Sequence, residues 1–203
     1  EKILQAEYKT TDPKLNIAAE KINTPDMVMV AAYQYALLRT IGACPNGIYR
    51  MSPEINGLVQ TSNNLARVLV KDGGFKILCL TRSSVDSEKM DLAKTICYNF
   101  EMAGAKPEFG GSYPGWAPKP DAPIVKLMSD LYEESFNAKA KVNAVHAGLE
   151  CGILGTNYPD MQMISFGPNI RGAHSPDEKV QISSVQKYWP FLLETLKRIP
   201  AKN

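Results

Sequence analysis

The chain has 203 residues, of which 44% are hydrophobic and 22% charged, enough to bury the core of one large domain or two small ones. The 23 basic and 21 acidic residues are interleaved and give a net charge of +2, so the sequence lacks the basic stripe that nucleic acid binding requires. Its longest apolar stretches are much shorter than the roughly 20 residues of a membrane span, so composition predicts a soluble globular protein that binds neither nucleic acid nor membrane.

The first segments of the chain predict a helix, a strand and a second helix. Residues 2–9 are typical of the end of a helix, and residues 16–22 of a strand. Thr24 and Pro25 suit the N-cap and first turn of a helix that ends near Gly42. This helix is mostly apolar, so we expect it to be buried.

An antiparallel sheet is predicted next. Strand-like segments lie at Gly47–Met51, 58–70 and 75–82, and the string Lys71-Asp-Gly-Gly supplies the positive φ angles of a tight hairpin between the last two. A helix beginning at Ser87 follows, with apolar residues at three- and four-residue spacing.

Gly104 is expected to end this helix, and a further strand is predicted at 106–109. Helices on one face of an antiparallel sheet indicate the α+β class. Residues 110–120 are rich in Gly and Pro and predict a linker at a domain boundary.

The second half has the alternating pattern of the α/β class. It predicts, in order, a helix at 122–136, a strand at 142–145, a helical turn after Gly148, a strand at 161–166 and a helix at 182–199. Two strands are too few to complete a parallel or mixed sheet. The incomplete sheet, and a start at Glu1 without Met or signal peptide, suggest a fragment.

Four cysteines are spread along the chain without a C-x-x-C pair: Cys44, Cys79, Cys97 and Cys151. Two of them lie in apolar segments, where a free thiol packs like a small hydrophobic group. This spacing favours free thiols and a reducing cytoplasm. Two disulfides in a secreted protein are the less favoured alternative, because a chain of this length does not need covalent crosslinks.

The two histidines are the first candidates for chemistry, since histidine is a common metal ligand and proton carrier near neutral pH. His174 follows a predicted strand, at the end of a sheet where α/β proteins place ligands. Pro176, and a helix cap from Ser175 or Asp177, would hold its loop rigid. A solvated surface histidine is an equally favoured alternative. Asp177 and Glu178 are mainly cap residues, and an orienting role toward His174 is less favoured.

His146 and Glu150 are four residues apart, so a helix would place both beside one metal ion. Gly148 between them indicates instead a strand that turns into a helix. A packing histidine and a carboxylate favoured by the helix dipole are an equally favoured alternative, and both residues can still line a cleft. Arg82 ends a predicted strand, where its guanidinium can bind a carboxylate through two hydrogen bonds, although a lone exposed arginine is the commoner case.

Several strings match one family nearly from end to end: Pro45-Asn-Gly-Ile-Tyr-Arg, Gly57-Leu-Val-Gln-Thr-Ser-Asn-Asn, Leu80-Thr-Arg-Ser, Tyr113-Pro-Gly-Trp, His146-Ala-Gly-Leu-Glu-Cys-Gly, Ser165-Phe-Gly-Pro and His174-Ser-Pro-Asp-Glu. Together they resemble the C-terminal portion of the aminoacyl-histidine (Xaa-His) dipeptidases, co-catalytic zinc metallopeptidases related to peptidase T and the carnosinases. The pairing of the two histidine strings is the most specific part of this resemblance.

The resemblance implies a domain order. Residues 1–113 would be most of an α+β lid and dimerisation domain, without its N-terminal part. Residues 114–203 would be the C-terminal segment of an α/β catalytic domain, which accounts for the incomplete second sheet.

The resemblance also implies roles for single residues. His174 would be a zinc ligand, Arg82 would bind the substrate's terminal carboxylate or the developing oxyanion, and Asn64 would lie near the cleft. Three further positions match the segment that lines the substrate site: His146, Gly148 and Glu150.

The resemblance places the family's other metal ligands and its general base in an N-terminal half that this sequence lacks: an His-x-Asp motif, a bridging Asp and a Glu-Glu pair. The whole enzyme would hold two Zn²⁺ per subunit, hydrolyse Xaa-His dipeptides with a metal-bound hydroxide, and act as a cytoplasmic homodimer formed through the lid. One imidazole cannot hold a catalytic zinc, so we expect this chain alone to be inactive. The alternative is a non-catalytic dimerisation or binding module of the same fold.

Overall fold

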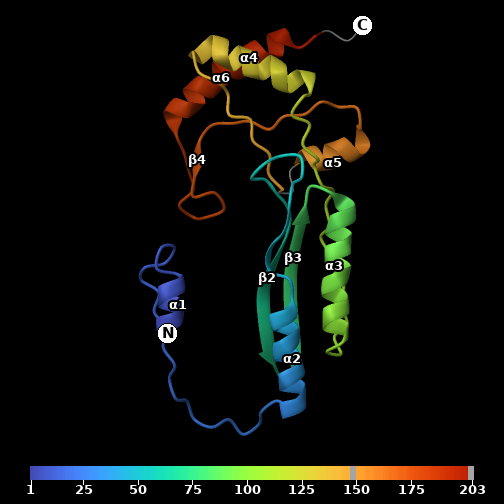
Figure 1. Ribbon diagram of the computed structural model, residues 1–203. Coiled ribbons are helices and arrows are strands. Elements are labelled where there is room, and N and C mark those ends of the chain that lie inside the picture. The colour runs from blue at the N-terminus through green and yellow to red at the C-terminus, as the bar shows by residue number, and fades with distance from the viewer. Residues whose placement is uncertain (147–149, 201–203) are drawn as a thin grey trace. The chain divides into compact units, whose positions relative to one another are not determined.

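A computed structural model of the chain describes residues 1–146 and 150–200 (Figure 1). The chain divides into two compact units, Glu1–Tyr35 and Ala36–Asn203. Helix α2 (Ala31–Ala43) begins in the first unit and continues into the second. Within the described ranges, no helix combines the length and the apolar character needed to cross a bilayer.

The first unit contains one predicted element and lacks another. The helix predicted at 2–9 is confirmed as α1 (Lys2–Glu7). The strand predicted at 16–22 is wrong, since these described residues form no strand. The segment has no ladder partner, and a strand is stable only when its backbone groups are paired with a neighbour.

The predicted start of the next helix at Thr24 is also wrong, because α2 begins at Ala31. Val28 and Val30 are 79% and 73% exposed, and their β-branched side chains lower helix propensity. Without a packed face, a cap signal does not overcome the cost of starting a helix. The expected burial is wrong as well, since Leu37 is the buried residue of α2 among the described positions.

The three predicted strands are confirmed as β1 (Gly47–Met51), β2 (Val59–Lys71) and β3 (Gly74–Ser83), in the antiparallel order β1-β2-β3. The predicted hairpin is confirmed too. Asp72 and Gly73 both have positive φ, 53° and 73°, as a two-residue turn of this hand requires.

The register of β2 against β3 shifts by one residue between Leu65 and Arg67. If residue pairs are counted from the turn, starting at Lys71 opposite Gly74, a hairpin without a bulge would set Arg82 opposite Asn63. The shift sets Ser62 opposite Arg82 instead. Side chains alternate between faces, so the bulge decides which residues share the face of Arg82.

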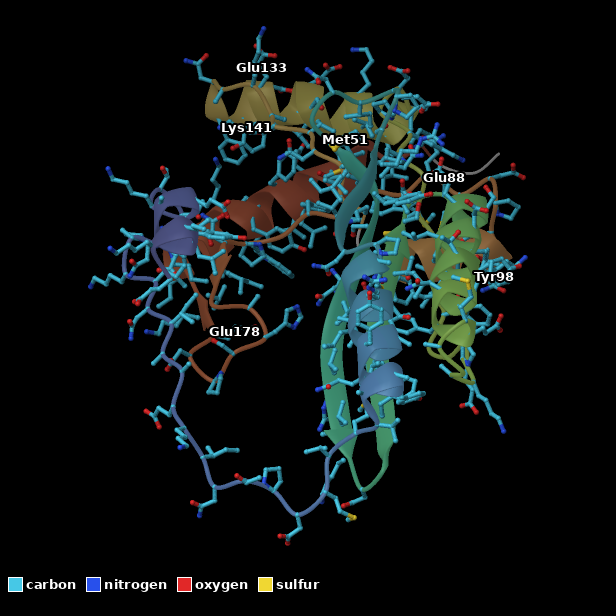
Figure 2. All side chains as sticks on the ribbon, turned by 60° about the horizontal axis from the view of Figure 1, so that its bottom comes forward. Met51, Glu88, Tyr98, Glu133, Lys141 and Glu178 are labelled. Carbon is cyan, nitrogen blue, oxygen red and sulfur yellow. The ribbon has the colours of Figure 1, made fainter. Side chains whose placement is uncertain are left out.

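Helix α3 (Asp86–Glu101) covers one face of this sheet (Figure 1). Its core residues, packed with Cys44 of the α2 end, are Leu92, Ile96 and Phe100. Tyr98 lies on the opposite side of the helix and points outwards (Figure 2). The helix ends before Gly104, whose φ of 81° suits glycine, as predicted.

The α+β class predicted for this part is confirmed, and all four cysteines are free thiols. The strand predicted at 106–109 is wrong, because these residues pair with no strand in the described chain.

The second half is built on a pair of helices that were predicted correctly, α4 (Pro123–Phe136) and α6 (Ile182–Arg198). They enclose a separate core that contains Met128, Leu131 and Phe191. The helical turn predicted after Gly148 is α5 (Glu150–Asn157).

The strands predicted at 142–145 and 161–166 are absent from the described residues. Both segments contain apolar residues, but neither has a strand beside it to bond with. A short hairpin that was not predicted, β4 (Ile170–Arg171) with β5 (Lys179–Val180), precedes α6 instead. The division into domains at residue 113 stays a prediction.

Candidate functional site

The predicted substrate-binding residues Arg82 and Asn64 lie on the same face of the β2–β3 pair. Arg82 is opposite Ser62, and Asn64 is opposite Leu80, two positions further along. Asn64, Leu80 and Arg82 are exposed, whereas residues between them face α3. On the face away from α3, the cation of Arg82 and the amide of Asn64 therefore lie near each other.

His146 meets this face through Ser62. Its Nε2 atom lies 2.8 Å from the Ser62 hydroxyl oxygen, across 84 residues of sequence. Partial burial lowers the pKa of His146, and the positive charge of Arg82 lowers it further. The imidazole is therefore neutral at neutral pH, and either the hydroxyl or the ring N–H donates the bond.

The structure thus brings Arg82, Asn64 and His146 together around Ser62. Ser62 itself was not singled out from the sequence, although it stands two positions before Asn64 in the same matching string. Glu150 is exposed at the first position of α5, where the helix dipole favours a carboxylate. Gly148 lies outside the described residues.

His174 is held in a different place, the loop between β4 and β5. Its backbone has a positive φ of 65°, and its backbone N–H donates to Glu178 Oε2 at 2.9 Å. Figure 2 shows Glu178 in this loop. The imidazole is left exposed, so the loop presents the ring rather than packing it.

The predicted helix cap from Ser175 or Asp177 is wrong. Ser175 Oγ donates to the Gly172 carbonyl at 2.7 Å, and α6 begins only at Ile182, after β5. The unpredicted hairpin separates the loop from the helix, so these side chains stabilise the loop itself. Glu178 orients the backbone of His174, not its ring.

A zinc ion needs more protein ligands than this loop provides. In the described residues, no three His, Cys, Asp or Glu side chains gather closely enough to hold a metal ion. Catalytic zinc takes three protein ligands in most sites, and His174 supplies one. The residues described here do not form a complete metal site by themselves.

A polar network behind the sheet supports the strand that carries Ser62. The Glu88 carboxylate of α3 accepts hydrogen bonds from Gln60 Nε2 at 2.7 Å and Thr61 Oγ1 at 2.8 Å, and it pairs with Arg50. Burial acts to raise the pKa of Glu88, but these hydrogen bonds and the charge of Arg50 outweigh it and lower the pKa. Glu88 is thus ionised at neutral pH and holds β2 against α3.

Comparisons with known proteins agree on one family. The model of the family described as "Peptidase family M20/M25/M40" matches residues 10–198. The "Cytosol non-specific dipeptidase" of Escherichia coli (strain K12) is 39% identical over 202 residues, covering 100% of this chain and 42% of that protein.

A crystal structure of aminoacylhistidine dipeptidase from Vibrio alginolyticus is similar in fold, with a TM-score of 0.86 and 38% identity. The match covers 100% of this chain and 41% of that one. The chain therefore spans about two fifths of the length of both relatives.

Proposed function

The chain belongs to the peptidase family M20/M25/M40, and on that premise we propose that it is part of a metal-dependent dipeptidase, in which it recognises the carboxylate end of the substrate. The observation that carries this proposal is the register that sets Arg82 opposite Ser62, because it gathers Arg82, Asn64 and His146.

Arg82 is the carboxylate-binding group in this proposal. Its guanidinium is an exposed cation on a paired strand, and its planar N–H groups match two carboxylate oxygens. Because His146 is neutral at neutral pH, it adds no second positive charge. Asn64 adds an amide that can donate to the substrate or accept from it.

His174 is proposed to bind the metal through its exposed ring. The resemblance assigns the remaining ligands and the general base to residues outside this chain, which is why we propose that the chain alone is inactive. One imidazole does not define the geometry of a metal site.

The carboxylate assignment is tested in the complete natural protein with Arg82→Met, which replaces the charged side chain with an unbranched apolar one. We expect KM for a free dipeptide to rise about 10- to 100-fold, as for the loss of a charge-assisted hydrogen-bond pair. A dipeptide with a C-terminal amide should be affected far less. The matched control is Arg67→Met, because Arg67 is opposite Leu78, further along the same strand pair. An equal effect of R82M on both substrates would contradict the assignment.

The metal assignment is tested separately by His174→Ala, with metal content measured on the purified complete protein. We expect H174A to lose bound metal, whereas His146→Ala, the control for the chain's other histidine, keeps it. Equal metal content in H174A and wild type would exclude His174 as a ligand.

Substrate choice, assembly and location complete the proposal. We propose Xaa-His dipeptides as substrates and a cytoplasmic homodimer that forms through residues 1–113. The names of the two relatives differ on substrate, so kcat/KM for dipeptides ending in His and in Leu decides between selective and non-specific hydrolysis. A complete protein that binds dipeptides without hydrolysing them would favour the non-catalytic module.

A further inference from the structure

A buried lysine lies in α3, on the other side of the sheet from the face that carries Arg82 and Asn64. Lys89, in the first turns of α3, is 8% exposed. Its Nζ donates to Asp86 Oδ1 at 2.6 Å and also to the backbone carbonyl of Tyr113. An ammonium group is removed from water at a cost of several kcal/mol, so a lysine is retained in such a place only with well-placed acceptors.

Asp86 extends this contact to the returning chain. The same oxygen, Oδ1, accepts the backbone N–H of Gly115 at 3.0 Å. Burial acts to raise the pKa of Asp86, but the hydrogen bonds from Lys89 and Gly115 and the charge of Lys89 outweigh it and lower the pKa. Lys89 and Asp86 thus form an ion pair at neutral pH that binds residues 113–115 to the start of α3.

Two glycines let the backbone pass through this contact. A Cβ atom on Gly115 would lie 2.6 Å from the Ser84 carbonyl oxygen, and one on Gly152 would lie 2.7 Å from the Pro114 carbonyl oxygen. Neither approach leaves room for a side chain without moving backbone. Residues 114–115 therefore pass between the end of β3 and the backbone of α5.

The residues that these glycines contact lie near the predicted site residues in the sequence. Ser84 follows Arg82 by two residues, and Gly152 is in α5, which begins four residues after His146. Separately, the contact between Ser62 and His146 joins β2, the strand paired with β3, to residue 146. The contacts of Lys89, Asp86, Gly115 and Gly152, here called the joint, thus connect the strand end that carries Arg82 to α5.

We infer that the joint sets the position of the Arg82 guanidinium relative to α5, and that Lys89 is a positioning residue for carboxylate recognition. This inference rests on the proposed function. The contrasting view is that Lys89 only stabilises the first turn of α3. These two roles of Lys89 predict different results. A positioning role requires Arg82, so replacing Lys89 should change KM only when Arg82 is present, whereas a purely structural role does not depend on Arg82.

The test is a double-mutant cycle in the complete natural protein with Lys89→Met and Arg82→Met. We expect K89M alone to raise KM for a free dipeptide about 3- to 10-fold, since small misplacements of a binding group are costly. It should leave KM for the C-terminally amidated dipeptide unchanged. In the R82M background, K89M should change KM less than two-fold, because its effect requires the guanidinium.

The control is Lys126→Met, which breaks an exposed lysine–aspartate pair on α4, with Nζ and Asp130 Oδ2 2.7 Å apart. It should leave KM unchanged with both substrates. If K89M does not fold, Gly115→Ala decides the question, because it keeps every charge and displaces the backbone at Ser83 and Ser84. We expect it to raise KM in the same substrate-dependent way.

Effects of K89M or G115A that are as large in the R82M background as in wild type would overturn the positioning role and leave the proposed function intact. An unchanged KM in a correctly folded K89M or G115A protein would do the same. If R82M itself did not change KM, the carboxylate assignment and this inference would fail together. The double-mutant cycle therefore distinguishes failure of the positioning role alone from failure of the proposed function.

Discussion

At the residue scale, His146 carries the most specific electrostatic prediction. Burial is the larger cause of its lowered pKa, and the charge of Arg82 is the smaller one. Replacing Arg82 by Met should therefore move the pKa upward, but not back to the ordinary value of 6.5. The pKa can be read from the imidazole NMR signals as pH is varied, with His146→Asn identifying the resonance. A pKa that did not move in R82M would show that Arg82 does not lie near the ring.

The same shift has a consequence for stability. Because the folded-state pKa is below the unfolded value, the unfolded chain binds more protons in the interval between the two. The contribution of a neutral His146 is complete above pH 6.5 and is lost as pH falls from 6.5 through the lowered folded-state pKa. The free energy of unfolding should fall less over this interval in H146N than in wild type.

Single residues also show how far sequence reasoning reaches. The neighbourhood of Arg82, Asn64 and His146 followed from matching strings, but Ser62, which connects them, did not. Its importance depends on the register shift near Leu65, and nothing in the sequence places a bulge there. The loop of His174 was predicted as a loop, but its stabilising bonds depend on a two-residue hairpin too short to be recognised.

At the element scale, several local signals succeeded, although the cap signal at Thr24 and Pro25 did not start a helix there. The Asp-Gly turn, the helix ending before Gly104 and the amphipathic helix α6 have such signals and were predicted correctly. The segments 16–22 and 142–145 have strand-like composition alone. A strand needs a neighbouring strand to pair with, and local composition does not reveal whether one is present. These predictions failed because strand formation depends on that non-local pairing.

Two glycines provide a matched test of these local signals. Gly73 has a φ of 73°, so Gly73→Ala should destabilise the hairpin by about 1 kcal/mol. Gly42 is exposed in α2, needs no positive φ and has no atom within 4 Å of where a Cβ would lie, so Gly42→Ala should stabilise by up to about 1 kcal/mol. Urea unfolding measures both, and a G73A protein as stable as wild type would contradict the turn geometry.

At the scale of the whole molecule, the described residues form two separate cores that share no residue. One contains Leu92 under the sheet, and the other contains Leu131 between α4 and α6. The joint connects these regions through hydrogen bonds and close backbone contacts rather than through a common apolar core. Regions linked in this way can open separately, because opening one does not expose the apolar surface of the other.

This separation makes the predicted domain division at residue 113 testable. Leu131 is 1% exposed, and Leu131→Ala should cost roughly 2–5 kcal/mol in its own core. In the complete protein, we expect amide hydrogen exchange to accelerate in α4 and α6 and to stay unchanged in α3. Leu92→Ala, at a position that is 0% exposed, is the reciprocal control and should accelerate exchange in α3 and the sheet. Equal acceleration on both sides of the joint in either variant would mean that the two cores unfold as one, and would place no domain boundary at residue 113.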